Sequence, residues 1–140
     1  MTARRRLSRV PTTSPHVSRE ARLRELNDGL RRFARAGIIC LTSGIQNLGE
    51  ERIMAVLDGV RSFDSFDVHN DPYDEHDLGV LKIAGERVMW KIDYYDRDRR
   101  FASPDPTDPA VTTRVLTIML VALSAPGVLV VLAIDRCQNR

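Results

Sequence analysis

The stretch LGVLKIAGERVMWKIDYY, residues 78–95, decides the fold class. Apolar and polar side chains alternate on both sides of the Ala84-Gly85-Glu86 turn, which is typical of a β-hairpin. Because successive side chains of a strand point to opposite faces, the alternation defines a core face and a polar face. The core face contains Leu81, Ile83, Val88, Trp90, Ile92 and Tyr94, and the polar face contains Lys82, Arg87, Met89, Lys91, Asp93 and Tyr95.

The segments around the hairpin add helices and at least one further strand. Apolar residues at spacings of three and four predict helices over 18–36, 47–62 and 108–122. The short apolar run 38–42 predicts a buried strand near the centre of the sheet, and 128–134 is interpreted as a last strand or a buried apolar tail. We therefore expect an α+β fold, in which a small, mainly antiparallel sheet, the hairpin plus one or two further strands, packs against two or three helices.

Length and composition predict one globular domain with a terminal segment on each side. The chain has 140 residues, of which 43% are hydrophobic and 29% charged. Residues 1–17 are basic and poor in apolar groups, so we expect a disordered tail, followed by a single domain over 18–120. Residues 121–140 form an apolar extension of uncertain structure.

The location of the protein is expected to be cytoplasmic. The N-terminal region lacks an apolar stretch that would act as a secretion signal. Residues 115–134 carry no charge and have the length of a membrane span. Pro126-Gly127 interrupts this run near its midpoint, which favours a turn between two buried elements over a membrane helix.

Charge is distributed unevenly along the chain. Residues 1–35 contain ten arginines and only three acidic residues, although the formal net charge of the whole protein is +2. One face of the first predicted helix is rich in arginine, which is compatible with nucleic-acid binding and equally with a solvated surface. The candidate binding residues on this face are Arg24, Arg31, Arg32 and Arg35.

Acidic and histidine side chains are concentrated just before the hairpin. His76 and Asp77, together with Lys91, Asp93 and Tyr95 on the polar strand face, are candidates for general acid/base catalysis. A solvated acidic turn is the competing interpretation. The spacing matches no calcium or zinc signature, so no metal is assigned, and the cofactor is unknown. Candidate residues for binding a protein partner are Asp71, Asp74 and Glu75.

Five segments carry a resemblance to a known family. They are FDSF at 63–66, NDPYDEHDLG at 70–79, WKIDYYD at 90–96, SPDP at 103–106 and DPAVTTRVLTIML at 108–120. With these segments the chain resembles an uncharacterised bacterial domain-of-unknown-function family, common on alphaproteobacterial plasmids and other accessory DNA. The resemblance implies no particular reaction, cofactor or catalytic residue.

Three functional hypotheses follow from these features. The leading one is a non-enzymatic binding or regulatory module of accessory-genome origin, which uses the acidic residues before the hairpin and the polar hairpin face to bind a protein partner. The first alternative is a small hydrolase or nuclease that uses the His76 and Lys91 groups described above. The second alternative is nucleic-acid binding through the arginine-rich first helix. A membrane partner is not expected, and the sequence leaves the oligomeric state open.

Overall fold

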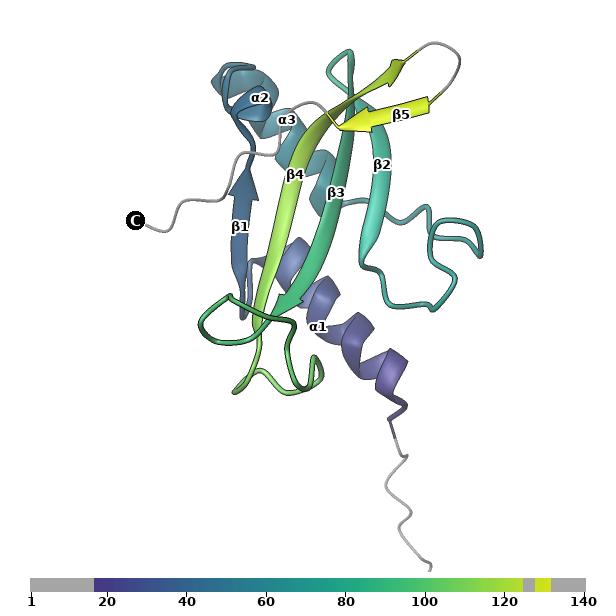
Figure 1. The fold of residues 1–140 in the computed structure, drawn as a ribbon. Helices are drawn as coiled ribbons and strands as arrows, with labels where there is room; N and C mark the ends of the chain where they lie inside the picture. Colours follow the sequence, from purple (N-terminus) through teal and green to yellow (C-terminus); the bar gives the residue numbers. More distant parts are fainter. Residues whose placement is uncertain (1–16, 125–127, 132–140) are drawn as a thin grey trace, which may run out of the picture.

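The computed structural model describes residues 17–124 and 128–131, and side chains as far as residue 122. The fold is α+β, as the sequence predicted (Figure 1). In chain order the elements are α1 (Arg19–Phe33), β1 (Ile38–Leu41), α2 (Ser43–Gln46), α3 (Glu50–Arg61), β2 (Leu78–Ile83), β3 (Glu86–Tyr95), β4 (Thr113–Ser124) and β5 (Val128–Val131).

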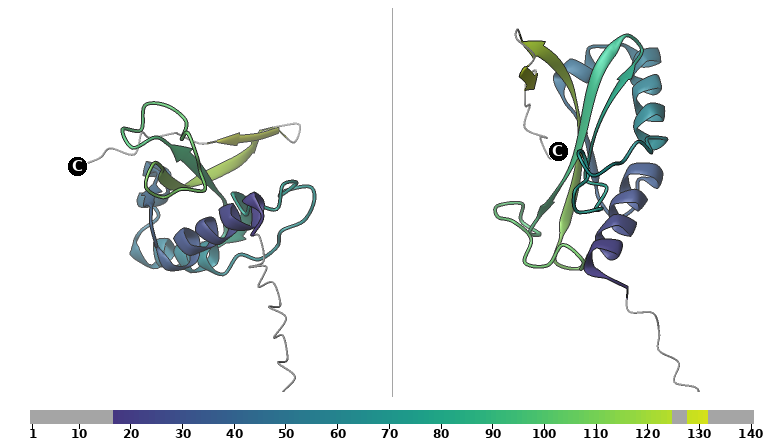
Figure 2. Two further views of the ribbon diagram at one scale, coloured as in Figure 1. Left: turned by 90° about the horizontal axis from the view of Figure 1, so that it is seen from below. Right: turned by 90° about the vertical axis from the view of Figure 1, so that its right-hand side faces the viewer.

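The sheet has the strand order β1-β4-β3-β2, and β5 pairs with the end of β4. Neighbouring strands are antiparallel except β1 and β4, which are parallel. The predicted hairpin is present, and its register places Gly79 opposite Trp90. Helices α1 and α3 lie on one face of the sheet (Figure 2). The candidate site described below therefore has a helical layer on one side and the sheet on the other.

The core lies between this face of the sheet and the helices. Trp90 and Val88 of β3 are fully buried, and they pack with Leu30 of α1 and with Val56 and Val60 of α3. The core face predicted for the hairpin is thus confirmed, since Tyr94, Leu81 and Ile83 also pack against this cluster. Burial of these large apolar side chains is the main favourable contribution to folding.

The third predicted helix is wrong, because residues 113–124 form β4. Asp108 caps a turn instead of a helix: its carboxylate accepts the backbone N–H of Ala110 at 2.9 Å, and its carbonyl accepts that of Val111 at 3.3 Å. Strand β4 lies between β1 and β3, and residues on both of its faces are buried. A strand buried on both faces has a continuous apolar sequence, which periodicity alone does not distinguish from a buried helix.

Other boundaries also differ from the predictions. The first helix begins after the predicted N-cap Ser18 but ends at Phe33, where Ala34 adopts the left-handed conformation with φ 54°. The predicted helix 47–62 corresponds to α3, Glu50–Arg61, whereas Asn47 is the C-cap of the separate short helix α2. β1 is an edge strand rather than a central one. β4 continues past residue 120, the expected end of the domain.

Part of the expected terminal structure lies outside the described residues. Of the last strand predicted over 128–134, the structure shows Val128–Val131, and residues 1–16 and 132–140 are outside the described ranges. None of the helices within the described ranges is long and apolar enough to cross a membrane.

Candidate functional site

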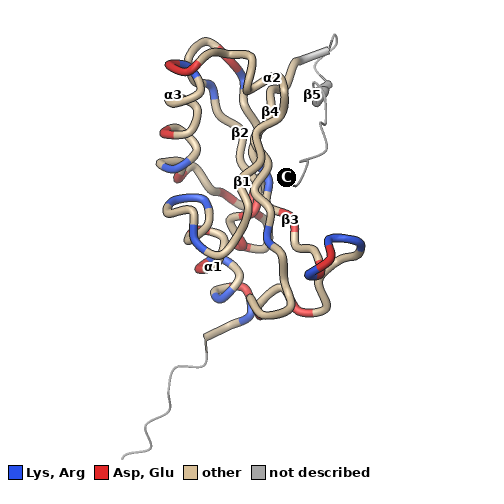
Figure 3. Tube along the Cα trace, turned by 90° about the vertical axis from the view of Figure 1, so that its left-hand side faces the viewer, with Lys and Arg blue, Asp and Glu red and all other residues tan. Residues whose placement is uncertain are grey.

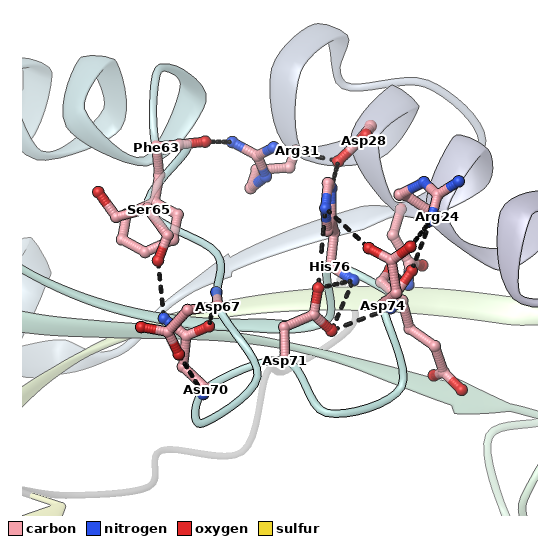
Figure 4. Close-up of polar contacts among 12 residues, drawn as sticks. Arg24, Asp28, Arg31, Phe63, Ser65, Asp67, Asn70, Asp71, Asp74 and His76 are labelled. Atoms are coloured by element: carbon pink, nitrogen blue, oxygen red, sulfur yellow. Dashed lines mark hydrogen bonds and ion pairs between the residues drawn. The ribbon is translucent and has the colours of Figure 1, made fainter.

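The acidic segment between α3 and β2, residues 62–77, folds back against α1 (Figure 4). His76 Nδ1 lies 2.9 Å from Asp28 Oδ1, and Arg24 forms an ion pair with the carboxylate of Asp74. Arg24 and Asp28 are one helical turn apart and therefore lie on the same side of α1. The Arg24–Asp74 ion pair and the contact between His76 and Asp28 thus fix this segment, called here the acidic loop, on the first helix.

Asp67 closes the first turn of the acidic loop. Its carboxylate accepts the backbone N–H groups of His69 at 2.8 Å and Asn70 at 3.1 Å. These hydrogen bonds from Asn70 and His69 favour the charged form and lower the pKa of Asp67. The Asn70 side chain in turn donates to the carbonyl of Ser65 at 2.7 Å. Asp and Asn are suited to this position because their short side chains bond to nearby backbone groups.

Asp71 closes the second turn and orients His76. Its Oδ1 atom accepts the backbone N–H of Glu75 at 2.9 Å and that of His76 at 3.2 Å. The Asp71 side chain is only 3% exposed. Asp74 and His76 both have positive φ values, 57° and 55°, a conformation that Asp and His adopt more readily than most residues.

The imidazole of His76 is held on three sides. The ring stacks on Phe66 with a centroid distance of 3.7 Å and an angle of 4°, and its Nδ1 atom contacts Asp28. The Nε2 atom lies 3.7 Å from Asp71 Oδ2 and also 3.7 Å from Asp74 Oδ1. A carboxylate oxygen of Asp71, a carboxylate oxygen of Asp74 and a ring nitrogen of His76 lie within 4.8 Å of one another. These three residues are therefore candidates to hold a metal ion.

Buried Arg31 connects α1 to the start of the acidic loop. Its Nη1 atom donates to the carbonyls of Val60 at 3.0 Å, Arg61 at 3.2 Å and Phe63 at 2.8 Å, and its Nη2 atom contacts Asp28 at 3.1 Å. Burial lowers the pKa of the Arg31 guanidinium. Arg31 is therefore a structural residue rather than an accessible binding residue.

A pocket of about 560 Å³ opens beside His76. Arg32 of α1 and Arg61 at the end of α3 contribute cations to its wall, and Asp64 and Asp74 of the acidic loop contribute carboxylates. The pocket, called here the His76 pocket, is lined by Asp28, Arg31, Arg32, Arg61, Ser62, Phe63, Asp64, Phe66, Asp74 and His76.

A second polar network lies under the acidic loop and involves Glu75. The Asn27 amide donates to Tyr94 Oη at 2.7 Å and to the Glu75 carbonyl at 3.0 Å, and Tyr94 Oη donates to Glu75 Oε2 at 3.2 Å. Arg114 Nε donates to the side-chain oxygen of Asn27, Oδ1, at 2.7 Å. Burial raises the pKa values of both Glu75 and Tyr94. Glu75 is thus part of an internal network.

The structure does not bring the proposed catalytic residues together. His76 stacks on Phe66, whose ring lies 6.0 Å from that of buried Trp90, so His76 is on the helical side of the sheet. Lys91 follows Trp90 in β3, and its side chain therefore points to the opposite face, where Nζ lies 2.9 Å from Asp93 Oδ2.

The other two catalytic candidates also lie apart from His76. By the same alternation Tyr95 is on the face of Lys91 and Asp93, where its backbone forms a bridge with Ala102. The Asp77 carbonyl accepts the N–H of Ile92 at 2.8 Å, and burial raises the pKa of the Asp77 carboxyl group. Among the described residues, no hydrogen bond joins the Asp77 side chain to His76.

The candidate arginines of the predicted first helix do not form a uniform cationic surface. Arg24 is paired with Asp74 and Arg31 is buried, whereas Arg32 and Arg35 stack on Phe33, which is 59% exposed. Their guanidinium groups lie 5.4 Å and 4.9 Å from the centre of the Phe33 ring. Basic and acidic residues are interspersed over α1 and α3 (Figure 3).

Asp28 and Phe66 are the site residues that sequence reasoning did not identify. Asp28 precedes His76 by 48 positions, and only the packing of α1 against the acidic loop brings them together. A weak signal exists in the helical spacing of Arg24, Asp28 and Arg31, which share one side of α1. Phe66 packs against the hydrophobic core, and its ring also stacks on His76.

Comparison with known families identifies the domain at the level of family alone. The family described as "Protein of unknown function (DUF3768)" matches residues 41–122, which is more than half of the chain. The chain belongs to the DUF3768 family. No curated protein and no solved structure shows a significant match to it.

The DUF3768 match extends from the end of β1 to β4 and includes the acidic loop with His76. Helix α1, which supplies Arg24, Asp28 and Arg31, precedes the matched residues. The match confirms the resemblance to a domain-of-unknown-function family, and for this DUF3768 protein it indicates neither a reaction nor a partner.

Proposed function

We propose that the domain is a non-enzymatic binding or regulatory module that engages a protein partner through the His76 pocket. The observation that carries this proposal is the fixation of the acidic loop on α1. Arg24 pairs with Asp74, His76 with Asp28, and the Arg31 guanidinium binds the carbonyl of Phe63. A binding surface that is ordered before the partner arrives loses less conformational entropy on association.

The chemistry of the His76 pocket favours a polypeptide ligand. Its wall combines the cations Arg32 and Arg61 with the carboxylates Asp64 and Asp74, and the ring of Phe66 adds an apolar surface. Mixed charges are complementary to a peptide segment that carries both signs. The uniformly anionic backbone of a nucleic acid would meet repulsion from the acidic side of this pocket.

The positions of the catalytic candidates support binding over hydrolysis. General acid/base catalysis requires the acting groups to reach one substrate within hydrogen-bond distance. His76 lies on the helical side of the sheet, whereas Lys91 and Asp93 pair with each other on the other side. A composite site built from these two groups would need a rearrangement of the sheet itself.

The proposal is tested by photo-crosslinking in living cells. A photoreactive amino acid is placed at position 32 or 61 in the pocket wall, or at control position 91 or 100. The proposal predicts a specific crosslinked protein from positions 32 and 61 and none from positions 91 and 100. Crosslinks to the same protein from 91 or 100 alone would place the interface elsewhere and contradict the proposal.

One observation favours nucleic-acid binding as a second candidate function. The guanidinium groups of Arg32 and Arg35 both lie over the ring of exposed Phe33. Aromatic rings flanked by arginines can stack on unpaired bases while the cations contact phosphates. Binding of single-stranded DNA that falls steeply with salt and is lost in Phe33→Ala would support this function, whereas salt-independent or absent binding would exclude it.

The setting of the protein belongs to the same proposal. We infer a cytoplasmic location and a bacterial accessory-genome origin, for which the sequence resemblance is the support. Fractionation of cells that produce the tagged protein tests the location. Recovery in the cytosolic fraction is expected, and recovery with the membrane or periplasm would contradict it.

A further inference from the structure

We propose that Asp71, Asp74 and His76 form a binding site for a divalent transition-metal ion, with Zn²⁺ as the best match. The site does not depend on the proposed partner-binding function. It was not predicted from the sequence, because the spacing of its residues matches no common metal signature. It becomes visible only in the folded acidic loop, where two turns bring the three side chains together.

The donor atoms are separated by distances that suit a small ion. His76 Nε2 lies 3.7 Å from one carboxylate oxygen of Asp71 and 3.7 Å from one of Asp74. With metal–ligand distances of about 2.0–2.2 Å, adjacent ligands of a tetrahedral zinc site lie roughly 3.4 Å apart. To close around an ion, both carboxylates would have to move closer to the imidazole, and the side chain of Asp74, which is 69% exposed, is the freer of the two to move.

The orientation of His76 is typical of a metal ligand. Its Nδ1 atom contacts the carboxylate of Asp28, which is held in turn by buried Arg31. Metal-binding histidines commonly donate their second ring N–H to a carboxylate, which fixes the tautomer and turns the other nitrogen toward the metal. Stacking on Phe66 fixes the plane of the same ring.

His76 Nε2 and the Asp71 carboxylate face each other without a hydrogen bond. At 3.7 Å neither carboxylate is within hydrogen-bond distance of His76 Nε2, and in the described part of the chain this atom has no hydrogen-bond partner. The Asp71 side chain that faces it is 97% removed from solvent, being 3% exposed. The Asp71 carboxylate accepts the backbone N–H groups of Glu75 and His76, and these hydrogen bonds hold it in place facing the imidazole nitrogen. A cation bound between this carboxylate, that of Asp74 and His76 Nε2 would be attracted by both negative charges.

The donor set selects the class of metal. One imidazole nitrogen and two carboxylate oxygens suit Zn²⁺ and neighbouring first-row ions, whereas Ca²⁺ and Mg²⁺ prefer six or more oxygen ligands. Three protein ligands leave a further position for water or another ligand. Asp74 and His76 also line the His76 pocket, so an ion held by them would lie at the wall of this pocket.

Isothermal titration calorimetry with Zn²⁺ tests the site. We expect one Zn²⁺ to bind per chain, with affinity reduced at least about tenfold in Asp74→Asn and in His76→Gln. Asp64→Asn removes a carboxylate of the same loop outside the triad, and Arg24→Gln removes the partner of Asp74 without removing a ligand. Both control variants are expected to bind Zn²⁺ as the wild type does.

Two outcomes would overturn the inference: a wild-type protein that binds no Zn²⁺, or equal affinity in wild type, Asp74→Asn and His76→Gln. Imidazole ¹⁵N spectra give a second readout, in which Zn²⁺ is expected to shift the Nε2 resonance of His76 while Nδ1 stays protonated. Asp74 is exposed, so its variant folds even if His76→Gln does not. Failure of zinc binding leaves the crosslinking result unaffected, which separates this inference from the proposed function.

Discussion

Replacement of Arg31 by methionine tests how the acidic loop is held on α1. The guanidinium makes three hydrogen bonds to carbonyls at the end of α3 and the start of the loop, and one to Asp28. Methionine fills similar space but donates no hydrogen bond. Three carbonyls, one of them in a buried contact, and the Asp28 carboxylate would then lose their donor.

The expected loss of stability is large. Each buried acceptor left without a donor costs about 1–3 kcal/mol. The Asp28 carboxylate left behind is 30% exposed and keeps its contact with His76, so it adds less than a fully buried ion pair, for which the loss of one partner costs about 3–5 kcal/mol. Relief of the burial of the guanidinium, which lowers the pKa of Arg31, offsets part of this cost. We therefore expect the free energy of unfolding of Arg31→Met to fall by about 3–5 kcal/mol, a large part of the total for a small domain.

Urea denaturation followed by circular dichroism measures this change. The matched control is Arg32→Met, which alters the neighbouring residue, whose guanidinium stacks on exposed Phe33. The control is expected to change the free energy of unfolding by less than about 0.5 kcal/mol. If Arg31→Met unfolded at the same urea concentration as the wild type, the role assigned to Arg31 would be refuted.

Three further predictions concern ionisation and packing. Burial raises the pKa of Glu75, so ionisation of this carboxyl group destabilises the folded state. The Glu75→Gln variant should therefore be more stable than the wild type at pH 7, and the difference should vanish below a pH of about 4. A variant less stable than the wild type at pH 7 would contradict this prediction. The pKa of Asp67 is shifted in the opposite direction, because backbone hydrogen bonds lower it. The Asp67→Asn variant should therefore be less stable than the wild type at pH 7, and this stability difference should disappear as the pH falls through the lowered pKa. Thermal melts that show a constant difference across this pH range would refute the prediction. A Cβ atom on Gly79 would lie 2.5 Å from the indole nitrogen of fully buried Trp90. The Gly79→Ala variant should therefore have a free energy of unfolding lower by about 1–3 kcal/mol. An unchanged denaturation midpoint would show that the indole moves aside.

The sequence predicted those elements whose side chains face two different environments. In β3, buried Val88, Trp90 and Ile92 alternate with partly exposed residues, so a period of two is visible. Strand β4 has no such alternation, because Leu116 and Ile118 are buried on one face and Met119 on the other. A continuous apolar run with Asp-Pro before it was therefore assigned to a helix, although its β-branched residues favour a strand.

The candidate site was predicted in part. The acidic loop and His76 were recognised from local composition, but Asp28 was not, because the contact between them depends on the packing of α1. Residue types also gave no information on which side of the sheet each group would lie. His76 and Lys91 are close to the same hairpin in sequence, yet the pleat of β3 and the fold of the loop place them on opposite faces.

The most direct test of the proposed binding function is the dissociation constant of the crosslinked partner for two charge-reversal variants. Arg61→Glu alters the wall of the His76 pocket, and Arg100→Glu alters an exposed residue of the connection between β3 and β4. A partner held by the His76 pocket should bind the Arg61→Glu variant at least about tenfold more weakly, with unchanged affinity for the Arg100→Glu variant. Unchanged affinity for Arg61→Glu together with weaker binding to Arg100→Glu would contradict the proposal.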